Sequence, residues 1–335
     1  MGHVHLAYLA QPTRGGWPTY TAHLAEGMRQ TGHTVHLWRI TRRAEKRTRP
    51  FRHLTYRNTT LDRLAEIARL QPLHITAAAP SQADQVAELL AAGASITVHD
   101  PTELRGEMPA ALRAARRPVV VIRRTVALHV HRLDVRAAFV AHPYATMSRP
   151  APARTRHAVS LARLDWDKHT DAIAAANERL PARLRVELHG AENRLFTHHR
   201  LTADHPGWRD YYRGPMPTAD LWAGAALAAS AHWAVDMSTI DGDGGGTQYT
   251  HLEALDGGAR LLLNAGWFGT PHDDPLLREV AAVAEPGELA AVLAEHPPPA
   301  SLQTSAALLA RHAAHRQAAA LLAVHHDKHE GGTTP

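Results

Sequence analysis

The sequence predicts an α/β protein built from two doubly wound domains, and three observations support this fold class. The chain has 335 residues, which exceeds one ordinary hydrophobic core and suits two domains of roughly 150 residues each. Short apolar runs of strand length alternate with segments of helical periodicity, as in parallel sheets covered by helices on both faces. The alternation stops at Ser148–Arg156, a segment rich in proline and arginine that is typical of a linker, and then starts again.

The first domain is expected over residues 1–150. A short apolar strand, Val4–Ala10, is followed by a loop rich in turn residues, Gln11–Pro18, and by a helix, Thr19–Gln30, which Gly32 ends. The remaining elements follow from the same patterns: strands over Thr34–Ile40, Leu73–Ala78, Ser95–Val98, Val119–Ile122 and Ala137–Val140, and helices over Leu61–Leu70 and Ser81–Ala92.

The second domain is expected over residues 157–300, where the strand-helix pattern repeats. Its predicted strands are His157–Leu161, Arg185–His189, His232–Ser238, Arg260–Asn264 and Val280–Glu285, and its helices are Asp171–Leu180, Thr218–Ser230, Thr247–Leu255 and Glu288–His296. One long helix rich in Ala and Leu is expected over residues 301–324, and a disordered tail over 325–335. Two such domains are expected to form a cleft between the carboxyl ends of their sheets.

The composition excludes several classes of protein. The chain has no cysteine, so disulfides, thiolate zinc sites and thiol nucleophiles are excluded. No apolar stretch approaches the roughly 20 residues that span a bilayer, and the N-terminus lacks the layout of a signal peptide. The 26 histidines include neither an HExxH motif nor a group with a carboxylate at a known ligand spacing, so no metal is expected. We expect a soluble, cytoplasmic monomer without a membrane partner.

Charge is distributed unevenly between the two halves. Residues 1–150 carry 21 Lys and Arg against 10 Asp and Glu, whereas residues 151–335 carry 16 against 22. A coding bias toward arginine explains why the chain has only three lysines, but not why the basic excess lies in one half. The excess predicts an anionic partner such as DNA, because phosphates are bound by clustered Arg and Lys. The candidate DNA-binding residues are Arg42, Arg43, Arg47, Arg116, Arg117, Arg123 and Arg124; Trp17 and Tyr20 are candidates to fill the gap left by a flipped base.

Two cations follow the first strand of the second domain. Arg163 and Lys168 stand five positions apart, ahead of a predicted helix. Fixed cations in a cleft would stabilise the negative charge that develops on a diphosphate leaving group. The alternative is that both are solvated side chains paired with Asp165 and Asp167.

A glycine-rich turn precedes a later helix of the second domain. Gly245, Gly246 and Thr247 would present backbone amides at the helix N-terminus, where phosphate is attracted. Glu253 lies further along this helix, where a carboxylate could bind ribose hydroxyls. The turn is neither a Walker loop nor a dinucleotide fingerprint, so a flexible loop followed by an exposed glutamate remains the alternative.

A His-Asp pair ends a strand of the first domain. Asp100 could accept or steer the proton of an acceptor hydroxyl, with His99 beside it. The alternative is an Asx turn, which the Asp100-Pro101 dipeptide favours by itself. Gly15 and Gly16, in the first strand-helix loop, would let backbone amides approach a donor, or serve as a plain turn.

The cations, the segment that contains Glu253 and the His-Asp pair resemble the patterns of a known family. Arg163 and Lys168, together with Glu253 on the late helix, resemble the pattern of the retaining GT-B glycosyltransferases. The segment Tyr249-Thr-His-Leu-Glu253 resembles the Tyr-Thr-His-Leu-Glu segment of the bacteriophage DNA α-glucosyltransferases. Val98-His99-Asp100 is similar to the His-Asp pair that those enzymes carry at a strand end.

This resemblance implies a GT-B fold, in which two Rossmann-like domains face each other across a cleft. It implies that residues 1–150 bind double-stranded DNA and that residues 157–300 bind the nucleotide sugar. The implied reaction moves glucose from UDP-glucose, or from another UDP-sugar, to a hydroxymethylated pyrimidine such as 5-hydroxymethylcytosine, without a further cofactor, in a phage-infected bacterial cell. The implied donor contacts are Gly15, Gly16, Arg163, Lys168, Gly245, Gly246, Thr247, Tyr249 and Glu253, and the implied catalytic residues are Asp100, His99, Arg163 and Lys168.

One position departs from the family pattern. Common members carry a second glutamate eight positions before the helix glutamate, where this chain has Gly245. Either the loop contacts the donor sugar through its backbone, or Asp243 takes over that role. Three alternatives also stay open: a glycosyltransferase with a small-molecule, lipid or envelope-glycan acceptor, a nucleotide-sugar epimerase, and a DNA-binding protein without activity.

Overall fold

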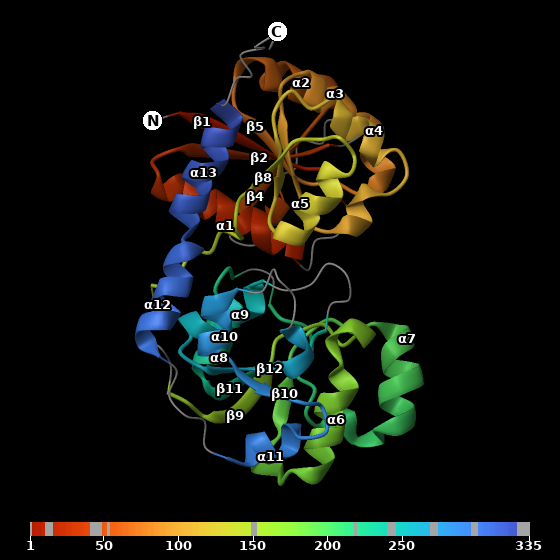
Figure 1. Cartoon of the computed structure of the whole chain (residues 1–335), viewed down its shortest axis with the longest axis vertical. Helices are drawn as coiled ribbons and strands as arrows, with labels where there is room; N and C mark the ends of the chain where they lie inside the picture. The colour runs from red at the N-terminus through yellow and green to blue at the C-terminus, as the bar shows by residue number, and fades with distance from the viewer. Residues whose placement is uncertain are drawn as a thin grey trace. The chain divides into compact units, whose positions relative to one another are not determined.

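The computed structural model describes residues 2–10, 16–40, 49–51, 54–148, 153–217, 220–239, 246–268, 274–295 and 301–326 of the chain. Contacts divide the chain into two compact units (Figure 1). Unit 1 comprises Met1–Ala145 and Arg311–Pro335, and unit 2 comprises Thr146–Ala310. The end of the chain therefore belongs to the same unit as its beginning.

Unit 1 is built on a sheet whose described strands lie in the order β3-β4-β2-β1-β5-β6-β7-β8. Among these strands, β3 at the edge is antiparallel to its neighbour and the other seven are parallel. The strands are β1 (His3–Tyr8), β2 (Thr34–Ile40), β3 (Arg49–Phe51), β4 (Leu54–Thr59), β5 (Leu73–Ala77), β6 (Ser95–Val98), β7 (Val119–Val121) and β8 (Ala137–Phe139). The helices are α1 (Gly16–Gln30), α2 (Leu61–Leu70), α3 (Ala83–Ala91), α4 (Met108–Arg113) and α5 (Arg124–His131).

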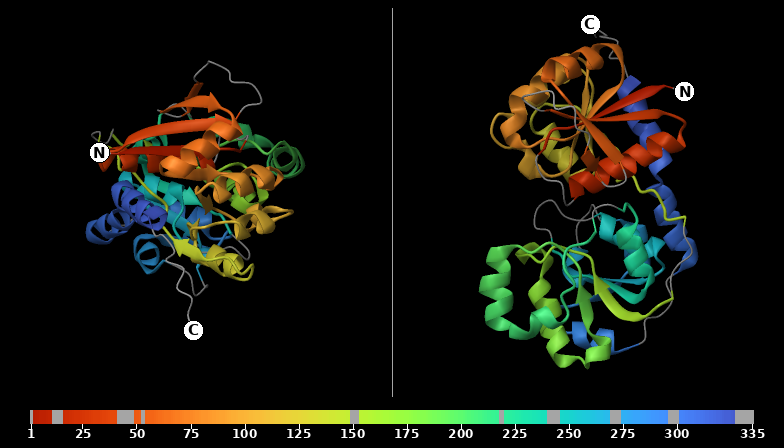
Figure 2. Two further views of the ribbon diagram at one scale, coloured as in Figure 1. Left: turned by 90° about the horizontal axis from the view of Figure 1, so that it is seen from above. Right: turned by 180° about the vertical axis from the view of Figure 1, so that it is seen from behind.

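The core of unit 1 explains why these segments are strands. Every residue of β5, β6 and β7 is buried, because helices cover both faces of the sheet, as the views in Figure 2 show. A strand covered on both faces has no solvent side, so its sequence is a continuous run with little alternation of polar residues. Helix α2 turns one apolar stripe, Leu64, Ile67 and Ala68, toward this core.

The single helix predicted over residues 301–324 is two helices, α12 (Leu302–Arg311) and α13 (Ala314–His326). They are interrupted because the backbone between them bonds to Tyr144, whose N–H donates to His312 O at 2.7 Å and whose carbonyl accepts from Ala314 N at 2.8 Å. Helix α13 packs against α1, where a Cβ on Gly27 would overlap the Ala314 carbonyl. His325, which was expected in a disordered tail, is a buried residue of α13.

Unit 2 contains a parallel sheet whose described strands lie in the order β10-β9-β11-β12-β13. Its strands are β9 (Arg156–Ser160), β10 (Val186–Leu188), β11 (Ala231–Asp236), β12 (Arg260–Asn264) and β13 (Ala282–Ala284). Its helices are α6 (Thr170–Arg179), α7 (Arg194–Phe196), α8 (Ala223–Ala229), α9 (Tyr249–Asp256), α10 (Pro275–Val280) and α11 (Leu289–Ala294), with a short 3₁₀ turn, η3 (Trp166–Lys168), after β9.

Each sheet has one point where the strand order reverses. In unit 1 the chain moves outward from β1 to β2 and β4, and then crosses to β5 on the other side of β1. In unit 2 it moves from β9 to β10, and then crosses to β11 on the other side of β9. Ligands of doubly wound folds bind at the carboxyl ends of the strands beside such a point. A ligand site is therefore expected at the carboxyl ends of β1 and β5 and at those of β9 and β11.

Within the described residues, no helix combines the length and the apolar character needed to cross a membrane.

Candidate active site

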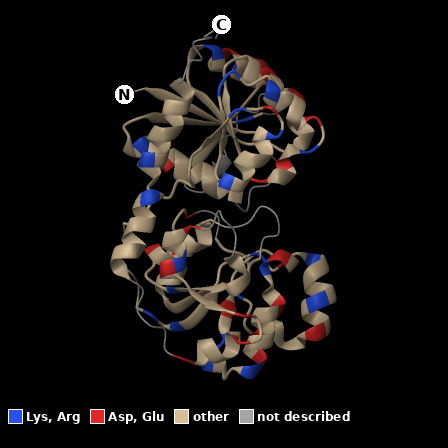
Figure 3. Ribbon diagram, viewed as in Figure 1, with Lys and Arg blue, Asp and Glu red and all other residues tan. Residues whose placement is uncertain are grey.

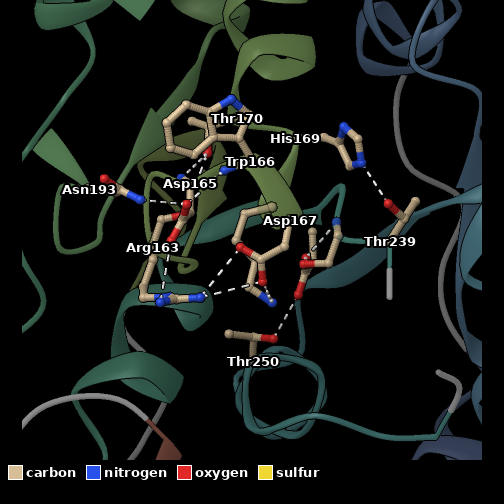
Figure 4. A network of polar contacts seen from close by, with 12 residues as sticks. Arg163, Asp165, Trp166, Asp167, His169, Thr170, Asn193, Thr239 and Thr250 are labelled. Atoms are coloured by element: carbon tan, nitrogen blue, oxygen red, sulfur yellow. Dashed lines mark hydrogen bonds and ion pairs between the residues drawn. The ribbon is translucent and has the colours of Figure 1, made fainter. Parts of the chain in front are cut away.

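The two predicted cations of unit 2 lie at the β9/β11 strand ends. Arg163 follows β9, and its guanidinium contacts two carboxylates: Nη1 lies 3.3 Å from Asp165 Oδ2, and Nη2 lies 3.4 Å from Asp167 Oδ1 (Figure 4). Lys168 Nζ lies 3.6 Å from Asp167 Oδ2. The ion pairs that the alternative interpretation expected are thus present. They bring both cations to one place at the reversal point of the sheet.

The two cations differ in burial. The Arg163 side chain is 56% exposed, whereas the Lys168 side chain is only 14% exposed. The charge of Lys168 also lowers the pKa of Asp236, a buried residue at the carboxyl end of β11. Because little of its side chain is exposed, Lys168 offers positive charge from a confined place, which suits the stabilisation of developing charge.

Asp236 organises the strand end beneath Lys168. Its Oδ1 accepts hydrogen bonds from the N–H of Ser238 at 3.0 Å and from the Ser238 hydroxyl, and its Oδ2 accepts from Thr250 Oγ1 at 2.9 Å. His251 Nε2 lies 3.4 Å from the same Oδ2. Burial by itself would raise the pKa of the Asp236 carboxyl, but His251, Lys168 and Ser238 together hold that pKa well below its ordinary value. Asp236 is therefore a buried carboxylate that joins β11, Lys168 and the start of α9.

The tautomer of His251 follows from its other nitrogen. The N–H of Gln248 donates to His251 Nδ1 at 3.2 Å, so in the neutral ring the proton sits on Nε2 and faces Asp236. This arrangement also satisfies one of the free N–H groups at the start of α9.

A second connection joins the β9 loop to the segment after β11. The N–H of Thr239 donates to the Asp167 carbonyl at 3.2 Å, and His169 Nε2 lies 2.6 Å from Thr239 Oγ1 (Figure 4). His169 adopts a left-handed conformation with φ 43°, which lets η3 turn directly into α6. The backbone that carries the two cations is thus tied to both central strands.

The glycine-rich turn is described only from Gly246 onward; Gly245 lies outside the described residues, as does Asp243. Gly246 has φ 82°, a conformation that side chains rarely adopt. Thr247 is buried and donates its hydroxyl to Asp274 at 3.2 Å. Tyr249 is the first residue of α9 and is partly exposed.

Glu253 is not the exposed helix residue of the alternative interpretation. It is buried, and its carboxylate lies against the first turn of α8, where a Cβ on Gly224 would overlap it. Gly224 is therefore required at this position for steric reasons. The sequence contained a signal for this contact, since glycine inside an alanine-rich helix is otherwise unfavourable.

In unit 1, His99 and Asp100 directly follow β6, beside the β1/β5 strand ends. His99 is buried, and its Nε2 lies 2.8 Å from the Thr76 carbonyl of β5, so the proton sits on Nε2 and Nδ1 is left as an acceptor. Burial lowers the pKa of His99 to about 4, which makes the ring neutral at pH 7. The Asx turn expected as the alternative for Asp100 is present, because Thr102 N–H donates to its Oδ1 at 2.7 Å.

The sequence analysis missed Glu103, a buried carboxyl beside this pair. The indole N–H of Trp17 donates to Glu103 Oε1 at 2.8 Å, and the backbone N–H of His99 donates to Oε2 at 3.1 Å. Burial raises the pKa of Glu103 to about 8, and the charges of Asp100 and Arg123 shift it further in opposite directions. Glu103 thus connects the start of α1 to the end of β6. A glutamate five residues after a strand has no sequence signature, because only the tertiary fold buries it.

The other residues of unit 1 for which a role was predicted differ in burial. Gly16 is exposed at the start of α1 with open space where a Cβ would be, and Gly15 lies outside the described residues. Tyr20 is fully buried and hydrogen-bonds Thr97 at 2.9 Å, so it cannot fill the gap left by a flipped base; that prediction was wrong. Trp17 is partly exposed and is held by Glu103.

The predicted DNA-binding arginines fall into three groups. Arg42, Arg43 and Arg47 lie outside the described residues. Arg116 and Arg124 are exposed, and Arg124 stacks over the exposed Phe139 ring at 4.8 Å. Arg117 and Arg123 are partly buried: Arg117 Nε donates to the Gly93 carbonyl at 3.0 Å, and Arg123 interacts with Glu103.

Further exposed arginines lie in the same part of unit 1. Arg113, Arg132 and Arg136 come from α4 and from the segment before β8, and Figure 3 marks basic positions in blue. Arg113 and Arg136 donate to the carbonyls of Leu133 and Arg116, at 3.3 Å each, so two of them are anchored by backbone groups rather than by acids. Together, the basic edge comprises Arg113, Arg116, Arg124, Arg132 and Arg136.

Comparison with known proteins adds a structural likeness. No protein-family model matches the chain, and no curated protein matches its sequence. Among solved structures, the Anabaena protein HepE in complex with UDP and glucose matches with a TM-score of 0.66 and 13% identity, over 96% of this chain and 100% of that one. AviGT4, a glycosyltransferase involved in avilamycin A biosynthesis, matches with 0.61 and 17%, over 96% and 97%. An α-glucosyltransferase in complex with UDP and a 13-mer DNA containing an HMU base matches with 0.64 and 10%, over 97% and 96%.

The chain shares its fold with these proteins. The predicted fold class, two Rossmann-like units of the GT-B type, is confirmed. Within this GT-B fold, Arg163, Lys168 and Asp236 occupy the strand ends of one unit, and His99, Asp100 and Glu103 those of the other. Among the described residues there is no group of three His, Asp or Glu side chains arranged to hold a metal ion.

Proposed function

We propose that the chain is a glycosyltransferase that uses a UDP-sugar as donor and acts, with retention of configuration, on the hydroxyl of a hydroxymethylated pyrimidine in double-stranded DNA. The observation that carries the proposal is the pair of cations, Arg163 and Lys168, at the β9/β11 reversal point of a fold shared with a UDP complex and with named glycosyltransferases. Glucose is the sugar that the UDP-glucose likeness favours.

The donor half of the proposal follows from the charges of unit 2. Transfer breaks the bond between the anomeric carbon of the sugar and the diphosphate oxygen, which leaves the electron pair, and negative charge, on UDP. The largely buried Lys168 and the more exposed Arg163 supply positive charge for that oxygen. The N-terminus of α9, with Gly246 and Thr247 before it, offers N–H groups to phosphate. Glu253, held in place by Gly224, is assigned to the ribose hydroxyls.

The acceptor half follows from the neutral groups of unit 1. The acceptor oxygen bonds to the anomeric carbon as its proton leaves, so a group near it must accept or relay that proton. His99 is neutral at pH 7 and presents Nδ1 as an acceptor, and the Asp100 carboxylate directly follows it at the end of β6. We assign the hydroxyl contact to these two residues.

DNA is favoured over other acceptors by the basic edge of unit 1. Its exposed arginines suit the phosphates of a duplex, and such contacts give binding that weakens steeply with salt. A small-molecule or glycan acceptor is the second candidate, because AviGT4 is named for the biosynthesis of avilamycin A.

The donor assignment is tested by calorimetry with UDP. Arg163→Ala and Lys168→Ala should each weaken UDP binding by at least about tenfold, the size expected when a charged hydrogen-bond partner is lost. Arg200→Ala is a matched control, because Arg200 is 52% exposed and also contacts two carboxylates, those of Asp171 and Asp204. If all three variants bind UDP as the wild type does, the donor site lies elsewhere.

The acceptor is tested by incubating hydroxymethylated DNA with a panel of nucleotide sugars and measuring the mass of the bases. A hexose adduct formed with a UDP-sugar supports the proposal. Transfer to a small-molecule acceptor but never to DNA would replace it with the second candidate, and DNA affinity that is flat with salt would contradict the role of the basic edge.

A further inference from the structure

We propose that Asp167 is an internal counter-anion of the donor site: its carboxylate pairs with Arg163 and Lys168 when no nucleotide is bound, and the diphosphate displaces it. The proposal rests on the function proposed above and adds a residue that weakens donor and product binding. The proposal gives a role to Asp167, an acidic side chain in a site for anions, where an acid would not be expected.

The geometry places one carboxylate between two cations. Both Asp167 oxygens lie 3.4 Å from Arg163 Nη2, and Oδ2 also lies 3.6 Å from Lys168 Nζ (Figure 4). Carboxylate and phosphate oxygens use the same N–H donors of arginine and lysine. A diphosphate bound by both cations would therefore compete with Asp167 for the same hydrogen atoms.

The side chain of Asp167 can leave without disturbing the loop. It is 46% exposed, so water can solvate the carboxylate once it turns away. Its backbone stays in place, because its carbonyl accepts the Thr239 N–H at 3.2 Å and the residue lies inside η3. Displacement thus requires a change of side-chain rotamer only.

Asp165, the other acid beside Arg163, is built differently. Its carboxylate accepts the Trp166 N–H at 2.9 Å and the Asn193 side-chain amide at 2.9 Å, and only 14% of the side chain is exposed. These bonds hold Asp165 as a fixed partner that keeps Arg163 oriented. Within the part of the chain that the structure describes, the polar contacts of the Asp167 carboxylate are with the two cations only.

The consequence is that neither cation of the empty site is bare. Arg163 faces Asp165 and Asp167, and Lys168 faces Asp167 and the charge of the buried Asp236, so an incoming diphosphate gains less than it would from uncompensated cations. After transfer, the return of Asp167 to the cations assists release of UDP. If each of the two ion pairs of Asp167 is worth as much as a surface pair, removing both should tighten UDP binding by about two- to thirtyfold.

The test compares Asp167→Asn with the wild type by calorimetry, using UDP, inorganic pyrophosphate and uridine as probes. Asparagine keeps the size of the side chain and removes its charge. We expect tighter binding of UDP and of pyrophosphate by a similar factor, and no change for uridine, which has no phosphate. Asp204→Asn is the matched control, because Asp204 is 47% exposed and pairs with Arg200 at 3.0 Å with the same i,i+4 spacing.

Each outcome decides between the two proposals. If the wild type binds UDP and Asp167→Asn binds it equally or more weakly, the counter-anion role is wrong while the donor site stands. If Asp204→Asn tightens UDP binding to the same extent, the effect reflects net charge and not this contact, and the role is again wrong. If the wild type binds neither UDP nor pyrophosphate, the proposed function fails, and the counter-anion role fails with it.

Discussion

The two strand-end clusters occupy equivalent places in their sheets but have opposite electrostatics. In unit 1, burial makes the two buried groups, His99 and Glu103, neutral at pH 7, with a pKa of about 4 for His99 and about 8 for Glu103. In unit 2, Arg163, Lys168 and Asp236 keep their charges, because each lies beside an opposite charge or several hydrogen-bond donors.

This difference shows that burial alone does not decide the charge of a strand-end group. Asp236 and Glu103 are both buried carboxyls with two or more donors. Asp236 also has Lys168 and His251 beside it, and its pKa falls, whereas Glu103 has only neutral donors in contact and its pKa rises. A charged cluster suits a diphosphate, and a neutral one suits a hydroxyl.

The largest expected effect is the loss of the buried carboxylate of unit 2. Asp236→Ala should lower the free energy of unfolding by about 3–5 kcal/mol, because it leaves Thr250 and Ser238 without their common acceptor and removes a buried negative charge that acts on Lys168. Urea unfolding at pH 7 measures this change. Since the folded-state pKa of Asp236 is lowered, its contribution is present above its ordinary pKa and is lost as the pH falls below that value. The difference between variant and wild type should therefore shrink in acid.

A loss as small for Asp236→Ala as for Asp204→Ala, an exposed acid of the same unit, would show that the charged cluster does not stabilise unit 2. The contrast between the charged cluster of unit 2 and the neutral cluster of unit 1 would then have no basis in their contributions to the free energy of unfolding.

The second effect concerns Glu103, whose pKa moves in the other direction. A carboxyl with a raised folded-state pKa stabilises the fold fully below its ordinary pKa of 4.5, and stability is lost as the pH rises toward about 8. Between pH 5 and pH 8 this group should reduce the free energy of unfolding by about 2–4 kcal/mol. Glu103→Gln should remove that slope, because glutamine cannot ionise.

Unfolding curves recorded at several pH values measure the slope in both proteins. Glu107→Gln, on an exposed glutamate of the same loop, is the control and should keep the wild-type slope. An unchanged slope in Glu103→Gln would mean that Glu103 is charged at pH 7, and the contrast between a neutral and a charged cluster would be lost.

Sequence patterns predicted the elements that bury continuous apolar runs, and missed those that depend on partners elsewhere in the chain. The strands β2, β6 and β12 have the predicted bounds. Strand β4 (Leu54–Thr59) was not predicted, because it has no continuous apolar run. Its exposed residues Thr55 and Arg57 alternate with buried ones. Helices α4, α5 and α10 were also missed, since each has only six to eight residues, too few to show a period.

The same reasoning applies to the candidate site. Arg163 and Lys168 could be identified because their spacing after a strand is a local feature of the sequence. Glu103 and Asp236 could not, because their chemistry comes from burial and from donors 14 to 86 residues away. Helix α3 begins at Ala83, two residues after the predicted start at Ser81, and its N-cap residue Gln82 makes no side-chain capping hydrogen bond.

A smaller effect is expected from the contact that positions Glu253. Gly224→Ala would put a methyl group into the Glu253 carboxylate and should destabilise unit 2 by about 1–3 kcal/mol, as overpacking does. UDP binding should weaken as well if Glu253 contacts the ribose. Gly287→Ala, at a glycine of the same unit with open space where the Cβ would be, is the control. Destabilisation without any change in UDP affinity would leave the steric contact in place but remove Glu253 from the donor site.

The smallest effect sharpens the description of the neutral cluster. Trp17→Phe removes the indole N–H that donates to Glu103 Oε1 and should lower the free energy of unfolding by about 1 kcal/mol. This hydrogen bond lowers the pKa of Glu103, so its loss should raise that pKa further and extend the pH-dependent fall in stability to higher pH. Trp166→Phe, at an exposed tryptophan of unit 2, should leave the pH dependence unchanged. If the fall in stability of Trp17→Phe instead ended at a lower pH, the indole would favour the protonated carboxyl of Glu103. The two clusters would then differ in the effect of their hydrogen-bond donors as well as in the compensation of their charges.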